Sequence, residues 1–114
     1  MSYTHDLIVI GGGAAGLTAA GLGANLGART LLVERHRLGG DCTWTGCVPS
    51  KALLKAAKVA HTAAHARDYG VDARVEGIDF TRVVGRIHRL REEIYVDADR
   101  PEIYEAMGVE TMAG

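Results

Sequence analysis

Two cysteines, Cys42 and Cys47, lie five positions apart and are the side chains of this 114-residue chain best suited to redox chemistry. We expect them at the start of a long helix over about residues 42–67, where Gly46 allows the distorted turn that a disulfide would need. A thiol at a helix N-terminus has a lowered pKa and favours the thiolate, the form that attacks disulfides. Structural thiols or a metal site are weaker interpretations, because zinc needs a tetrahedral set of N or S ligands and there is no second cysteine pair.

A glycine-rich turn over residues 11–16 carries a second kind of chemistry. Its sequence fits the pattern G-x-G-x-x-G and lies between a β-branched apolar run and an Ala-rich segment of helical pattern. In that setting the first glycine allows the tight turn, the second lets the backbone approach a pyrophosphate, and the third lets the helix pack closely. Helix-terminal N–H groups would face the anion. The predicted contacts are Gly11, Gly13, Ala14, Ala15 and Gly16.

An acid follows at the spacing that a dinucleotide site requires. Glu34 ends the second predicted strand, 18 residues after Gly16, and is placed to accept hydrogen bonds from the ribose hydroxyls of an adenosine. Because the strand, the helix and the acid all occur at the spacing of this motif, we predict that this segment binds a dinucleotide. The alternative is a tight turn between strand and helix that holds no ligand.

Hydrophobic patterning predicts the elements that position these groups. The first 34 residues read as a βαβ unit, with strands at about 6–10 and 30–33, each buried on both faces, and a right-handed crossover helix from 14 to 26. We therefore expect an α/β fold with a Rossmann-like unit and additional helices.

Further along the chain, residues 71–77 read as a loop or a weak edge strand, and Asp79 can cap another helix. Pro101 suits the first turn of a short helix, and Val109 begins a third strand. The apolar stripe of the capped helix is expected to be core: Phe80, Val83, Val84, Ile87, Leu90 and Ile94.

Composition limits the classes of function. The chain is 47% hydrophobic and 24% charged with a net charge of −1, which is typical of one soluble globular domain. A near-neutral charge does not favour nucleic acid as a partner, and no apolar run is long enough for a membrane span. The N-terminus lacks the pattern of a signal peptide, so we expect a cytoplasmic protein.

The motifs together resemble those of a known family. Residues 6–16, DLIVIGGGAAG, the acid after the second strand, and residues 39–51, GGDCTWTGCVPSK, resemble the N-terminal part of the FAD-dependent pyridine nucleotide-disulphide oxidoreductases. The C-V-P-S-K ending is most similar to the mercuric reductase and lipoamide dehydrogenase branches. The resemblance implies that FAD is held by the glycine turn together with Glu34, Arg35, Gly40, Asp41 and Lys51.

The resemblance also implies a mechanism. NAD(P)H would reduce FAD, and the electrons would pass to a Cys42–Cys47 disulfide. Cys47 would be the thiolate in contact with the flavin, and Cys42 would exchange with a disulfide or a metal-ion substrate such as Hg(II). Lys51 would stabilise negative charge on the reduced ring. The family is homodimeric, so a second subunit is the expected partner.

Two residues depart from the family pattern, which usually has Thr before the first cysteine and Asn two positions after it. Here these positions hold Asp41 and Trp44. A carboxylate beside Cys42 should oppose thiolate formation, and an indole alters the substrate side, so no particular substrate is carried over.

The alternative function is a non-catalytic nucleotide-binding or interaction module, which has no need of the cysteine pair. A simple NAD-binding protein would also leave the cysteines unexplained. We expect residues 1–114 to be the N-terminal portion of an incomplete FAD domain, since only three strands are predicted where sheets typically have about 4 to 6. The isolated chain is therefore expected to lack NAD(P)H-dependent turnover.

Overall fold

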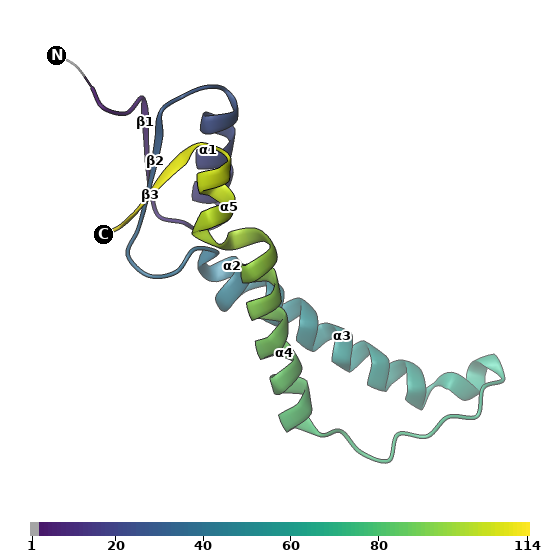
Figure 1. Ribbon diagram of the computed structural model, residues 1–114. Helices are drawn as coiled ribbons and strands as arrows, with labels where there is room; N and C mark the ends of the chain where they lie inside the picture. The colour runs from purple at the N-terminus through teal and green to yellow at the C-terminus, as the bar shows by residue number, and fades with distance from the viewer. Residues whose placement is uncertain (1–2) are drawn as a thin grey trace.

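The computed structural model describes residues 3–114 and has two parts (Figure 1). The head, residues 3–46 and 95–114, contains a three-stranded sheet and the helices that cover it. The arm, residues 47–94, extends away from the head. The chain is a mixed α/β fold, as predicted, with a Rossmann-like arrangement of parallel strands. In chain order the elements are β1 (Leu7–Ile10), α1 (Ala14–Asn25), β2 (Thr30–Glu34), α2 (Gly40–Trp44), α3 (Cys47–Ala64), the 3₁₀ turn η1 (Ala66–Tyr69), α4 (Phe80–Ile94), the π-helical turn η2 (Tyr95–Asp99), α5 (Pro101–Ala106) and β3 (Val109–Ala113).

The sheet has the order β1-β2-β3, and both strand pairs are parallel. Leu7 lies opposite Thr30 in the first pair, and Thr30 lies opposite Val109 in the second. The predicted strand at Val109 is therefore confirmed. Because β2 is the central strand, the end that carries Glu34 lies beside the end of β1, where the glycine turn begins.

The prediction that β1 is buried on both faces is wrong. Leu7 and Val9 are half-buried on the side of α1, but Ile8 is 57% exposed and Ile10 is 87% exposed. Side chains of a strand alternate between the two faces of the sheet. Within the described residues, no element buries the face that carries Ile8 and Ile10, so an all-apolar strand is buried on one face only.

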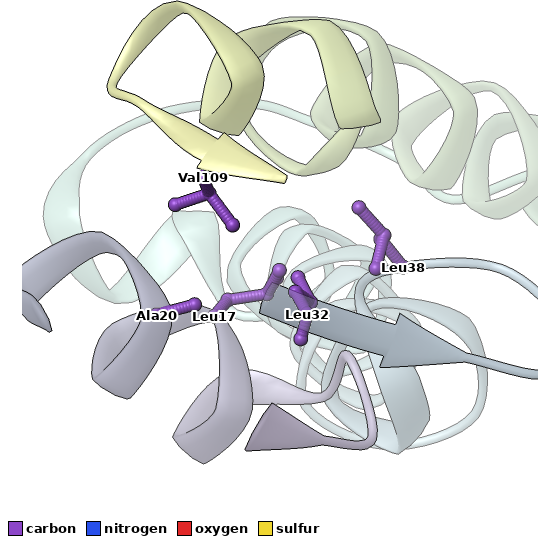
Figure 2. Packing of buried hydrophobic residues seen from close by; sticks show 5 residues of the cluster. All are labelled: Leu17, Ala20, Leu32, Leu38 and Val109. Carbon is purple, nitrogen blue, oxygen red and sulfur yellow. The ribbon is translucent and has the colours of Figure 1, made fainter. Parts of the chain in front are cut away.

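The core lies between α1, the sheet and the helices that precede β3. Figure 2 shows its five buried side chains converging from α1, β2, the loop before α2, and β3. Around them, Tyr95 and Tyr104 are partly buried and pack against the cluster. The core comprises Leu17, Ala20, Leu32, Leu38 and Val109.

The single helix predicted from about residue 42 to residue 67 is two helices. The α2 helix ends at Trp44, and α3 begins at Cys47. The carbonyl oxygen of Asp41 accepts the N–H groups of both Thr45, at 3.0 Å, and Gly46, at 2.5 Å, which closes the first helix. Gly46 then adopts a non-helical conformation with φ −114° and ψ −102°. The break therefore lies between the two cysteines.

The arm consists of α3, η1, a loop and α4, and Figure 1 shows the two long helices joined at the far end by residues 70–79. That segment is a loop, as one of the two interpretations predicted, and Asp79 caps α4 by accepting the N–H of Arg82 at 3.1 Å. The prediction that the α4 stripe is core is wrong: Phe80 is 63% exposed, and neither α3 nor α4 contains a buried residue. The α3 and α4 helices pack chiefly on each other, and two helices alone cannot enclose a core.

The elongated arm gives the chain extents of 72 × 26 × 18 Å. Its radius of gyration is 20.0 Å, whereas a compact domain of this length has about 13 Å. Within residues 3–114, none of the helices combines the length and apolar character needed to cross a membrane.

Candidate cofactor and redox site

The glycine turn joins the ends of β1 and β2 to the start of α1. Gly11 N–H donates to the carbonyl oxygen of Val33 at 2.8 Å, which continues the pairing of the two strands into the turn. A methyl group on Gly16 would overlap the carbonyl oxygen of Gly11, so the first turn of α1 packs directly on the loop. The close approach that the motif predicts at its third glycine is present.

A second glycine loop touches the first. A methyl group on Gly40 would lie 2.6 Å from the Cα of Gly13, and Gly39 N–H donates to the carbonyl oxygen of Gly12 at 2.7 Å. The N-cap of α1 has no side-chain hydrogen bond, which leaves the N–H groups of the first turn, including those of the exposed Ala14 and Ala15, as donors for an anion.

Glu34 connects the end of β2 to the glycine turn. Its Oε2 accepts the N–H of Gly12 at 2.7 Å, and its Oε1 accepts the N–H of His36 at 2.8 Å. These hydrogen bonds, first that of Gly12 and then that of His36, hold the pKa of the carboxyl group below its usual value. The ionised carboxylate retains lone pairs that can accept further hydrogen bonds, for example from hydroxyl groups.

A hollow of about 640 Å³ lies where these segments meet. This volume is typical of small-molecule sites. Five of the residues predicted to contact a cofactor line it: Gly11, Glu34, Arg35, Gly40 and Asp41. The sequence prediction missed other lining residues, namely Ile10, Val33, His36, Arg37, Trp44 and Gly114.

Neither cysteine lines this hollow: Cys42 directly follows the lining residue Asp41, and Cys47 lies on the other side of the break between α2 and α3. Cys42 is half-buried in α2, Cys47 is exposed as the first residue of α3, and both are free thiols. A hydrogen bond with Cys47 and burial raise the pKa of the Cys42 thiol. The expectation of a lowered pKa at a helix N-terminus is therefore wrong for Cys42, because Cys42 is the third residue of a five-residue helix and faces another thiol.

Charged groups on both sides act on Cys42. The Lys51 ammonium on α3 lowers the pKa of the Cys42 thiol, and the Asp99 carboxylate raises it. We expected Asp41, the neighbour in sequence, to oppose the thiolate. The Asp99 carboxylate, which raises this pKa, comes from the distant η2 turn, which the fold brings against α2.

Trp44 is the centre of a stack that the sequence did not predict. The Arg37 guanidinium lies 3.7 Å from the centroid of Trp44 and 4.6 Å from that of Tyr95, and it also forms an ion pair with Glu92 at 3.0 Å. The indole N–H of Trp44 donates to the carbonyl oxygen of Leu38 at 2.8 Å. The only sequence signal was the unusual residue type at position 44. The stack lines the hollow through Arg37 and Trp44.

In the described residues, no group of three or more His, Cys, Asp or Glu side chains is arranged to hold a metal ion. The groups that the described residues bring together here are a glycine cradle, an acid with a lowered pKa and a pair of thiols.

Comparison with known proteins agrees with this geometry. Residues 5–111 match the family model for pyridine nucleotide-disulphide oxidoreductase. Dihydrolipoyl dehydrogenase of Bacillus subtilis (strain 168) is 42% identical over 86 residues, which are 75% of this chain and 18% of that protein. Dihydrolipoyl dehydrogenase 2 of Haloarcula marismortui is 54% identical over 68 residues, 60% of this chain and 14% of that protein.

A third relative, dihydrolipoyl dehydrogenase of Rhizobium etli, is 43% identical over 89 residues, 75% of this chain and 18% of that protein. The chain spans less than a fifth of the length of these curated relatives. The family model, by contrast, matches nearly all of the chain, from the strand before the glycine turn into β3. The chain belongs to the pyridine nucleotide-disulphide oxidoreductase family.

Proposed function

We propose that residues 1–114 are the N-terminal portion of the FAD-binding part of a disulfide oxidoreductase that uses NAD(P)H as electron donor. One observation carries the proposal: a single hollow is lined by both glycine loops and by the ionised Glu34, and the thiol pair, Cys42 and Cys47, begins directly after the lining residue Asp41. A module that only binds nucleotides has no need of the thiol pair. FAD, when bound, would supply the two-electron chemistry that connects a nicotinamide donor to these thiols.

The residues present fit such a cofactor. At Gly40 an added methyl group would lie 2.6 Å from the Cα of Gly13, so the two loops meet backbone to backbone, and backbone N–H groups can approach a pyrophosphate directly. The carboxylate of Glu34 would accept hydrogen bonds from ribose hydroxyls. Arg35 and Asp41 border the same hollow. Lys51 is exposed on α3 and would place its positive charge near the thiols and the reduced ring.

The thiol pair would carry out disulfide exchange. The Cys42 thiolate attacks one sulfur of the substrate disulfide and forms a mixed disulfide, and the released sulfur takes a proton. The Cys47 thiolate then attacks Cys42, which frees the second substrate thiol and leaves a Cys42–Cys47 disulfide. Two electrons have passed from the protein to the substrate. In the opposite direction, the same steps oxidise a dithiol.

A small dithiol or disulfide is the substrate class that we propose. The relatives reported above are named dihydrolipoyl dehydrogenases, and their identity with this chain extends over most of its length. This favours a dithiol over the metal-ion substrate suggested by the C-V-P-S-K ending. Because the chain spans less than a fifth of the length of these relatives, we propose that these 114 residues alone do not turn over NAD(P)H.

The test of the proposal is FAD binding by a glycine variant that keeps the fold. A methyl group on Gly13 would meet its nearest neighbour, the Cα of Gly40, at 3.8 Å, which is an ordinary contact. G13A should therefore fold normally while its methyl group blocks the pyrophosphate. We expect the chain to bind FAD and G13A to bind at least about tenfold more weakly, equivalent to about 1.4 kcal/mol, in fluorescence titrations.

The matched control is G85A on α4, far from the hollow, where the nearest atom to an added methyl group is Arg89 Nη1 at 3.7 Å. G85A should bind FAD as the unchanged chain does. If the chain binds no FAD, or if G13A and G85A bind it equally well, the proposed cofactor site is wrong.

A further inference from the structure

Asp99 is a buried carboxylate that faces the helix carrying Cys42. Its side chain belongs to a residue only 9% exposed, and its Oδ2 accepts a hydrogen bond from the hydroxyl group of Thr43 at 2.6 Å. Thr43 is itself 4% exposed. Acids are rarely buried unless they are paired, because removing a carboxylate from water is costly. An apolar side chain would fill this position without the free-energy cost of removing a carboxylate from water.

The space around this hydrogen bond is tightly filled. Gly39, at the N-terminus of α2, has φ +103°, and a methyl group there would lie 2.7 Å from Asp99 Oδ2 and 2.9 Å from Thr43 Cβ. The carboxylate therefore packs against the backbone at the start of α2 as well as bonding to a side chain within it. Both contacts fix the position of the short helix.

The π-helical turn η2 brings two side chains to the same short helix. Tyr95 and Asp99 lie four residues apart, at the ends of η2. The ring of Tyr95 lies 5.5 Å from that of Trp44, and Asp99 bonds to Thr43. Thr43 and Trp44 are the two residues that follow Cys42. Single π-helical turns within α-helices are frequent at functional sites.

Other charged and titratable groups face the same segment. Cys47 and Lys51 act on Cys42 from α3, and Asp99 acts from η2. From α4, Arg91 Nη1 donates to the carbonyl oxygen of Trp44 at 2.7 Å. Asp99 is the group whose negative charge opposes ionisation of Cys42 from outside the thiol pair, and Lys51 is the group whose positive charge favours it.

We propose that Asp99 is a positioning residue for the thiol pair: through Thr43 it fixes α2, the helix that carries Cys42, relative to Cys47 on α3. The negative charge of Asp99 also opposes ionisation of Cys42. This inference rests on the proposed function, because it assigns a role only if the two cysteines form a redox pair. It adds two residues, Thr43 and Asp99, that lie outside the predicted set.

The experiment measures disulfide closure in the full chain against oxidised dithiothreitol. The two cysteine thiols give up two electrons and two protons, a Cys42–Cys47 bond forms, and the disulfide of the reagent is reduced to a dithiol. We expect D99A and T43V each to lower the equilibrium constant for closure about tenfold or more, since each removes a buried hydrogen bond to a carboxylate. T43S keeps the hydroxyl group and should restore closure to within about twofold of the unchanged chain.

The D99N variant separates the effect of the Asp99 hydrogen bond from the effect of its charge. A purely structural role does not predict that the charge affects Cys42. The amide oxygen of D99N still accepts the Thr43 hydroxyl, so closure should stay near that of the unchanged chain. Its lost charge should make the Cys42 thiolate form at lower pH, which is followed by ultraviolet thiolate absorbance in a C47S background. D97N, an exposed acid on the same turn, is the control and should change neither measurement.

The outcomes separate the two proposals. If the unchanged chain forms no Cys42–Cys47 disulfide, the proposed redox function is contradicted. If it does form one but T43V and D99A close equally well, or if the pH profile of D99N equals that of D97N, the role of Asp99 is wrong while the redox function stands. T43V keeps the test informative even if D99A fails to fold, because it changes only the hydroxyl group.

Discussion

At the residue scale, Glu34 links the fold to the proposed cofactor. Its carboxylate accepts the backbone N–H groups of Gly12 and His36, which connects the end of β2 to the glycine turn. The same ionised oxygens keep lone pairs for ribose hydroxyls. The residue was predicted as a ligand, but its hydrogen bonds show that it also supports the loop that would hold that ligand.

We predict that E34Q destabilises the chain in a pH-dependent way. The pKa of Glu34 is lowered in the folded state, so its contribution is present above the pKa of an ordinary Glu, about 4.3, and is lost as the pH falls through the lowered value. At pH 7, E34Q should lower the free energy of unfolding by about 1 kcal/mol in urea titrations. The difference should shrink as the pH falls below about 4.

The matched control for this prediction is E76Q, which changes an exposed acid in the loop of the arm. It should alter stability by less than about 0.5 kcal/mol at either pH. A difference between E34Q and the unchanged chain that persists undiminished at low pH would show that the Glu34 charge is not what supports the turn.

At the element scale, the break between α2 and α3 determines how the cysteines are presented. A continuous helix would have carried both thiols on one rigid rod. Instead, Asp41 closes the first helix through its carbonyl oxygen, and Gly46 redirects the chain before Cys47. Each cysteine is then positioned by its own helix, and the α2 helix is held from outside by η2 through Asp99.

The cap of α4 provides a prediction at this scale. Asp79 accepts the N–H of Arg82, so D79A should lower the stability of the helix by about 1 kcal/mol, while D79N, which can form the same cap, should stay within a few tenths. Hydrogen exchange of the first-turn amides of α4 measures both effects. Equal exchange in D79A and D79N would contradict the capping role. Neither variant should change FAD binding, since the cap lies outside the hollow.

At the scale of the whole molecule, apolar side chains are unequally buried. Leu32 on the central strand is 1% exposed, whereas Ile10 at the end of β1 is 87% exposed although both lie in apolar strand sequences. The buried apolar cluster lies in the head, and the arm adds two helices that contact chiefly each other.

We predict that L32A and I10A differ in their effect on the free energy of unfolding, because Leu32 is buried and Ile10 is exposed. L32A should lower the free energy of unfolding by about 3 kcal/mol, because it leaves a cavity in the core. I10A should change it by no more than about 0.5 kcal/mol in the same 114-residue chain. Urea denaturation of both variants measures the difference, and comparable losses would contradict the exposed face of β1.

The sequence by itself determined the features that depend on short-range patterns. The βαβ unit, the glycine turn, the acid at position 34 and the cap at Asp79 all follow from residue types within a few turns or one crossover. Local backbone chemistry decides such features, because the glycines and the cap act on neighbours in the chain. The Cys42 and Cys47 pair was likewise identified from the sequence, as part of a motif.

Only the tertiary structure decided what surrounds that motif. Asp99 reaches Thr43 across 56 positions, and Glu92 reaches Arg37 across 55, so no local pattern could place them. For the same reason, no local pattern could show that Asp99 opposes ionisation of Cys42. Burial, too, depends on what packs against a face: the patterns of β1 and α4 showed which residues are apolar, and the packing of the other elements decided which of them are covered.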